Sequence, residues 1–243
     1  MGKEKIHRHS QNYEGQHTCP SEQNHACISL VSIFNHLEEK QMEEISKVTR
    51  SVSYKKKEII YSAGEKSDSL YIVASGKVRI YRLSESGKEQ LVRILKAGDF
   101  TGELALFNES IHEAYAETMV DTNICMITRK DLQVFLMKYP SISLMILSEF
   151  SKRLESSEKQ SARFATEKVE RRIALFLTEC VEDDEETREF QLPMSKKDLA
   201  SYLGTTPETL SRKLTEFEDL GYIKQLEQRK IRILDFDGLL FLS

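Results

Sequence analysis

The chain has no apolar run long enough to cross a bilayer, and its polar N-terminal stretch lacks the apolar core of a signal peptide. It also lacks a glycine-rich phosphate loop, a zinc-protease helix and the serine turn of the α/β-hydrolases. These absences argue against a membrane protein and against the common enzyme classes. We therefore expect a cytoplasmic protein that is not an enzyme.

There is no excess of positive charge, because 35 Lys and Arg stand against 39 Asp and Glu, a formal net charge of −4. This balance does not exclude nucleic-acid binding, since affinity depends on the charge of the docking face. Cysteine is also scarce, at four positions: Cys19, Cys27, Cys125 and Cys180. In a chain without a secretory signal, so few cysteines argue against structural disulfides and favour metal or redox chemistry where they cluster.

The pattern along the chain divides it into four parts. Residues 1–28 form an arm that contains histidine and cysteine, without helical or strand periodicity. Residues 29–139 hold short alternating runs broken by glycines, which predict an antiparallel β-roll. Residues 140–166 are helical, and residues 167–243 form a helical segment, a helix-turn-helix and a β-ribbon. The fold class is therefore α+β, with a roll, a long helix and a winged helix-turn-helix.

The long helix carries an a/d seam in which Leu147, Phe150 and Leu154 are spaced three and four residues apart. Serines continue the seam at positions 157 and 161, which indicates a weak interface. A symmetric homodimer would bury this seam. The alternative is an ordinary amphipathic helix that packs on the roll.

Residues 195–214 predict two short helices joined by a turn at Gly204. Thr206 can cap the second helix, and proline follows it at the first helical position. Glu208, Ser211 and Arg212 then lie on its outward face, which suits the major groove of DNA. Bases that we expect near phosphates are Lys196, Lys197, Arg212, Lys213 and those of the ribbon at 229–234. The alternative is a helical hairpin with a solvated polar face.

The segments Ala97–Leu104 and Thr206–Arg212, in this order, resemble the CRP/FNR family of bacterial transcription regulators. The resemblance covers nearly the whole chain. It implies a roll of the cyclic-nucleotide-binding kind, a dimer on double-stranded DNA, and RNA polymerase as a partner. It also assigns base contacts to Glu208, Ser211 and Arg212 and phosphate contacts to Lys196, Thr206 and Thr209. The expected sites are FNR-like palindromes with TTGAT-type half-sites.

One departure concerns the nucleotide. Members that bind cyclic AMP keep Gly-Glu-Leu and carry an Arg-Ser or Arg-Thr pair some residues later. This chain keeps Gly102–Leu104 but has Glu113 and Ala114 in place of that pair. A carboxylate repels phosphate and cannot replace a bidentate guanidinium. We therefore expect no cyclic AMP binding.

The cysteines resemble those of the oxygen-sensing branch, which holds a [4Fe-4S] cluster. By this resemblance Cys19, Cys27 and Cys125 are metal ligands, but the middle N-terminal cysteine of the branch is absent. The fourth ligand would be His17, His25, Glu22 or another group.

Three alternatives to the cluster stay open. The first is a dithiol–disulfide switch between Cys27 and Cys125, as in the FNR-like proteins of lactic acid bacteria. The second is zinc or haem on the N-terminal arm. The third is a set of cysteines without a regulatory role, and Cys180 in particular is expected to be a core residue. A different class, a nucleotide-binding regulatory module attached to another activity, is disfavoured by the winged helix.

Overall fold

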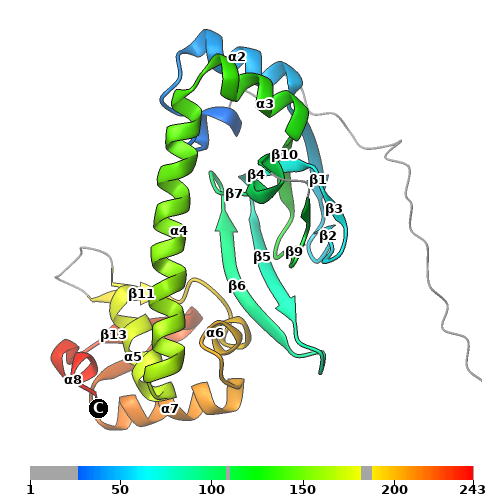
Figure 1. Ribbon diagram of the computed structural model, residues 1–243. Coiled ribbons are helices and arrows are strands. Elements are labelled where there is room, and N and C mark those ends of the chain that lie inside the picture. Colours follow the sequence, from blue (N-terminus) through cyan, green and yellow to red (C-terminus); the bar gives the residue numbers. More distant parts are fainter. Residues whose placement is uncertain (1–26, 108–109, 182–187, 243) are drawn as a thin grey trace, which may run out of the picture.

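The computed structural model describes residues 27–107, 110–181 and 188–242. The chain forms an antiparallel roll, one long helix and a small helical domain with a three-stranded sheet (Figure 1). The roll lies beside the long helix, and the small domain lies at that helix's C-terminal end (Figure 1). The predicted α+β class, with roll, long helix and winged helix-turn-helix in this order, is confirmed.

The roll contains two four-stranded antiparallel sheets, with strand orders β1-β10-β4-β7 and β2-β9-β5-β6, and the short pair β3–β8. Its strands are β1 Arg50–Tyr54, β2 Ile59–Tyr61, β3 Lys66–Ser67, β4 Ser69–Ser75, β5 Lys77–Leu83, β6 Glu89–Lys96, β7 Phe100–Thr101, β8 Ser110–Ile111, β9 Tyr115–Thr118 and β10 Thr122–Thr128. A 3-10 turn, η1, spans Glu103–Leu106. Buried apolar side chains from both four-stranded sheets share one core.

Glycine at position 76 explains the tight turn between β4 and β5. Its φ is +93°, and a Cβ there would lie 2.4 Å from the Thr122 hydroxyl oxygen on β10. Any larger residue would therefore push β10 away from this turn. The turn lets β4 and β5 enter different sheets while both stay on the same core.

A second core, which we call the cysteine core, lies where the N-terminal segment meets the roll and the start of the long helix. Segment 27–37 contributes its apolar side chains, and α2 Glu39–Val48 and α3 Arg129–Lys138 pack around it. Its buried members are Cys27, Ile28, Val31, Ile33, Phe34, Leu37, Ile45, Leu70, Ile72, Phe100, Cys125, Ile127, Leu132, Phe135, Ile142 and Ile146.

The long helix is α4, Ser141–Thr166. Ile142 and Ile146 are buried in the cysteine core, so the first turns of α4 are fixed to the sensor part of the chain. Leu147 and Leu154 are 57% and 61% exposed. Phe150 differs from them, because it is half-buried against the cysteine core and its ring lies 5.9 Å from that of Phe107.

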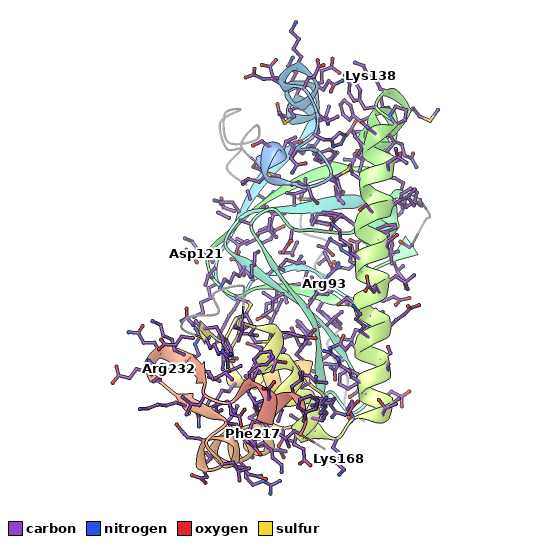
Figure 2. All side chains as sticks on the ribbon, turned by 90° about the vertical axis from the view of Figure 1, so that its left-hand side faces the viewer. Arg93, Asp121, Lys138, Lys168, Phe217 and Arg232 are labelled. Carbon is purple, nitrogen blue, oxygen red and sulfur yellow. A yellow bond between two sulfur atoms is a disulfide. The ribbon has the colours of Figure 1, made fainter. Side chains whose placement is uncertain are left out.

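The C-terminal domain consists of α5 Val169–Glu179, β11 Glu189–Gln191, α6 Lys196–Tyr202, α7 Pro207–Asp219, β12 Ile223–Gln225, η2 Glu227–Arg229, β13 Lys230–Ile233 and α8 Phe236–Leu240. The sheet order is β11-β13-β12, so the predicted ribbon has a third strand that the sequence pattern did not indicate. Apolar faces of these elements form the winged-helix core, which includes the buried Phe217 (labelled in Figure 2). Cys180 is half-buried at the end of α5, so the expectation of a core cysteine is wrong.

Candidate nucleic-acid interface and cysteine pair

Hydroxyl caps define both helices of the helix-turn-helix. The Ser195 hydroxyl accepts a hydrogen bond from the Asp198 amide at 3.1 Å and starts α6. The Thr206 hydroxyl accepts from the Thr209 amide at 3.2 Å and starts α7, with proline in the first turn. Because the caps satisfy amides that have no partner within the helix, they fix the residue at which each helix begins. The register of the outward face of α7 follows from that start.

The faces of α7 are separated as the sequence predicts. Leu210 and Leu214 are fully buried in the winged-helix core. Glu208, Ser211 and Arg212 are exposed on the other side. The pKa of Glu208 lies below its usual value, because its carboxylate accepts from its own amide and from the Thr206 hydroxyl. The exposed set therefore offers an ionised acceptor, a hydroxyl and a guanidinium, which are suited to base edges.

The basic residues of the domain are less available than the sequence suggests. The Lys213 ammonium lies 2.8 Å from carboxylates of both Glu170 and Glu216, so Lys213 belongs to a structural ion pair and not to the phosphate contacts we expected. On the ribbon, Arg232 pairs with Glu189 of β11, and 45% of its side chain stays exposed (Figure 2 labels Arg232). The sequence pattern did not indicate this partner of Arg232, because β11 was not predicted.

Other bases keep the expected placement. Lys196 begins α6, and its ammonium donates to the Gln225 side-chain oxygen of β12 at 3.0 Å. This bond places the amine between the helix-turn-helix and the ribbon. Lys197 and Lys230 are exposed. The tip of the ribbon turns through positive φ at Gln228 and Arg229, at +56° and +64°.

The two cysteines that face each other in the cysteine core are bonded. Cys27 and Cys125 form a disulfide with their Cα atoms 6.8 Å apart, and each residue is 1% exposed. Cys125 lies on β10 opposite Ser51 of β1, whose hydroxyl is 3.4 Å from its sulfur. A disulfide was the less expected state of these cysteines. The sequence paired these two cysteines only through the family resemblance, because they lie 98 positions apart.

The described residues do not form the ligand set of an iron–sulfur cluster. A cubane takes four protein ligands, and in the described ranges no group of three or more His, Cys, Asp or Glu side chains could hold a metal ion. Cys27 and Cys125 supply two sulfurs, bonded to each other in an apolar core. The expected ligand Cys19 and the candidates His17, Glu22 and His25 lie outside the described residues.

A cavity of about 150 Å³ opens in the roll beside the Gly102–Leu104 segment. The Glu103 carboxylate in it is bound by Arg93 at 3.1 Å and by Arg153 of α4 at 2.5 Å. Arg93 lies between the strands of the roll and α4 (Figure 2). Burial alone would raise the pKa of Glu103, but the two guanidinium groups hold it below its usual value.

The same cavity is lined by the two residues that stand in place of the expected Arg-Ser or Arg-Thr pair. Glu113 and Ala114 line it, and the Glu113 carboxylate pairs with Arg82 at 2.5 Å. His112 is buried there, with its ring stacked 3.7 Å from that of Tyr61. Arg82 lines the cavity too, so a bound phosphate would meet Glu113 as one half of an ion pair. The absence of cyclic AMP binding stays a prediction.

Taken together, a sensor-type roll, a long helix with exposed leucines and a helix-turn-helix with an exposed polar face define a DNA-binding regulator. The chain matches the family described as "Cyclic nucleotide-binding domain" over residues 51–139 and the one described as "Crp-like helix-turn-helix domain" over residues 171–242. It belongs to the CRP/FNR family of transcription regulators, in the FNR-like branch.

Curated relatives extend along nearly the full chain. It is 32% identical over 218 residues to the probable transcriptional regulator flp of Lacticaseibacillus casei, covering 88% of this chain and 97% of that protein. It is 29% identical over 221 residues to the anaerobic regulatory protein of Haemophilus influenzae, covering 89% and 85%. It is 28% identical over 221 residues to the fumarate and nitrate reduction regulatory protein of Vibrio cholerae, covering 89% and 88%.

Solved structures agree on the fold. The structure of FixK2 from Bradyrhizobium japonicum has a TM-score of 0.67 at 27% identity, covering 79% of this chain and 96% of that one. A CooA mutant from Carboxydothermus hydrogenoformans has a TM-score of 0.72 at 24% identity, covering 86% and 93%, which supports the fold alone. Within the described ranges, every helix is too short or too polar to span a bilayer.

Proposed function

We propose that this protein is a dimeric transcription regulator whose DNA binding responds to redox state through Cys27 and Cys125. The observation that supports this most directly is the position of the pair. Both sulfurs lie in the same core as Ile142 and Ile146, the first buried residues of α4. A covalent change at the pair therefore acts on the packing beneath the helix that leads to the DNA-binding domain.

The chemistry of the switch is thiol–disulfide exchange. Oxidation joins the two sulfurs and removes two protons and two electrons, which pass to a small disulfide that leaves as two thiols. The bond ties segment 27–37 to β10 and so stabilises the surface on which α4 begins. We expect the oxidised dimer to bind DNA more tightly than the reduced dimer for this reason.

Dimerisation would use α4. Leu147 and Leu154 lie one heptad apart with more than half of each side chain exposed, so one of the two seam positions is free to meet a partner helix. Two-fold symmetry would then present two α7 helices to a palindromic site. Glu208, Ser211 and Arg212 would contact TTGAT-type half-sites, and RNA polymerase would be the protein partner on that DNA.

The test measures DNA affinity in both states of one preparation. Full-length protein is reduced with dithiothreitol or oxidised with glutathione disulfide, and the Kd for a TTGAT palindrome is measured by fluorescence anisotropy. Tighter binding after oxidation, which Cys27→Ser and Cys125→Ser abolish and Cys180→Ser preserves, supports the proposal. Equal affinity of the two wild-type states contradicts it.

The [4Fe-4S] cluster on Cys19, Cys27 and Cys125 remains the competing proposal, supported by the FNR-like branch of the family. Anaerobic purification separates the two. A brown protein that contains iron and sulfide, bleaches in air and loses its colour in Cys19→Ser supports the cluster. A colourless protein in which two thiols are lost on oxidation supports the switch, and stoichiometric zinc or haem would support the third hypothesis. In each case the cavity beside Glu103 is expected not to bind cyclic AMP.

A further inference from the structure

The β5–β6 ribbon of the roll reaches beyond its neighbouring strands to the C-terminal domain (Figure 1). The register of the ribbon shifts at this point, where Tyr81 pairs with Leu91 but Ile80 pairs with Arg93, so Val92 is an extra residue. Such a bulge re-aims the side chains around it. Leu91 is 2% exposed and belongs to the winged-helix core, although it lies on a strand of the roll.

Hydrogen bonds concentrate on one residue of α6. The Ser201 hydroxyl donates to the Glu89 carbonyl at 2.8 Å and accepts from the Leu91 amide at 2.7 Å. The Ser201 carbonyl accepts from the Gln90 side-chain amide at 2.7 Å. Three bonds thus join Ser201 to consecutive residues of β6. Each intramolecular hydrogen bond adds only modestly to the stability of the fold. Three of them around the buried Leu91 together hold β6 at one specific position on α6.

An ion network lies at the edge of the same contact. Arg79 of β5 binds the carboxylates of Glu89 at 2.8 Å and Glu117 at 3.0 Å, and Asp198 of α6 lies 3.7 Å from it. Burial alone would lower the pKa of Arg79, but its hydrogen bonds with Glu117 and Glu89 raise it. The guanidinium therefore stays charged and links the roll to the first helix of the helix-turn-helix.

The end of α4 contacts the C-terminal end of α6 and the turn that follows it. The Gln160 side chain donates to the Tyr202 carbonyl at 3.3 Å. The Phe164 ring packs against Gly204, where a Cβ would approach the ring within 3.0 Å. The C-terminal end of α6 therefore contacts both the β5–β6 ribbon and the long helix, while the outward face of α7 remains exposed.

We infer that the β5–β6 ribbon is a bracket that positions the helix-turn-helix for DNA, and that Ser201 and Leu91 are its positioning residues. The bracket bonds to α6 at Ser201, and its turn at 87–89 lines one cavity with Thr205 and Pro207 at the start of α7. The side chains of Glu208, Ser211 and Arg212 stay exposed. α7 lies at the end of the molecule opposite α2 and α3 (Figure 1), where DNA can approach it. The inference rests on DNA binding by α7 and does not depend on the chemistry of the cysteines.

The test uses the full-length protein with Ser201→Ala, which removes two of the three bonds. Apparent affinity scales with the populated fraction of the competent state, so we expect the Kd for the palindrome to rise about fivefold in both redox states. Hydrogen exchange should accelerate in peptides that contain the Leu91 amide, which lies in the roll. A role confined to the stability of α6 would leave that amide unchanged.

Two further variants sharpen the test. Thr178→Ala removes a hydroxyl that donates within α5 to the Leu175 carbonyl and should change neither measurement. Gln90→Ala combined with Ser201→Ala should cost less than the sum of the single changes, because both act on one contact.

Unchanged affinity alongside faster exchange at Leu91 would overturn the bracket, since the contact would exist without positioning α7. Tighter DNA binding by Ser201→Ala would also overturn it, because the contact would then restrain the domain. Failure of the redox proposal has a different signature: wild-type affinity that is equal after reduction and oxidation. If wild-type protein bound no DNA, the assignment of α7 would fail, and the bracket with it.

Discussion

The cysteine core and the winged-helix core are built from similar apolar side chains but are held together differently. The cysteine core contains a covalent bond between residues 98 positions apart and includes the first turns of α4. The winged-helix core contains no cysteine among its buried members. One of those members, Leu91, lies on β6 of the roll. Under the proposed redox function, oxidation would act directly on the first core and would reach the second only through other contacts. Changes in the two cores should be separable by experiment.

The largest effect is expected in the cysteine core, from Cys125→Ser. In the chain-entropy description, a cross-link that closes a loop of this length contributes about 4–5 kcal/mol. Guanidinium denaturation of oxidised protein should show a loss of that order, while reduced wild type and reduced variant should nearly coincide. Cys180→Ser serves as the control. A small loss in oxidised protein would mean that the bond contributes little to the first core.

Leu154→Ala acts between the two cores, on the exposed seam of α4. Burial of a leucine contributes about 2 kcal/mol, and a two-fold dimer loses it twice. Light scattering over a dilution series should show dissociation at higher protein concentration than for wild type. Val134→Ala, an exposed apolar residue of α3, provides a comparison of similar chemistry. A dimer as stable as wild type would exclude this seam.

Arg212→Ala is expected to change DNA recognition without affecting either core. Loss of a bidentate base contact costs about 1–3 kcal/mol on the cognate palindrome and little on random DNA. The loss should be the same for oxidised and reduced protein, in contrast to changes at the cysteines. Anisotropy titrations on both DNAs check this, and equal loss on cognate and random DNA would contradict the base contact.

Lys196→Ala should have the smallest effect. Removing one phosphate contact weakens binding to all sequences and reduces the salt slope by about one. Kd values measured over a salt series give that slope. Lys213→Ala is a matched contrast, because its ammonium is held by Glu170 and Glu216 and should leave the slope unchanged.

Local signals predicted much of the fold. Ser195 and Thr206 cap the helices where the sequence placed them, and the heptad spacing located α4. These signals act over three to seven residues, so a single sequence displays them. β11 was missed because its three residues carry no such signal before they pair with β13.

Predictions that required distant partners fared less well. Lys213 and Arg232 are residue types that commonly contact phosphate, but here they form ion pairs with Glu170 and Glu189. Phe150 fits the seam by spacing, yet it packs toward the roll. In each case the competing partner lies on another element, so residue type and spacing could not decide the role of the side chain.

The sequence by itself determined the order of the parts, the family and the polar face that α7 leaves exposed. Those features depend on periodicity, caps and motifs of neighbouring residues. Only the tertiary structure brought Cys27 to Cys125, which lie 98 positions apart in the chain. It also placed the Leu91 amide against the Ser201 hydroxyl, 110 positions away. The physical reason is strand pairing, because the register of β10 against β1 and the bulge in β6 place these side chains, and neither is visible in the local pattern.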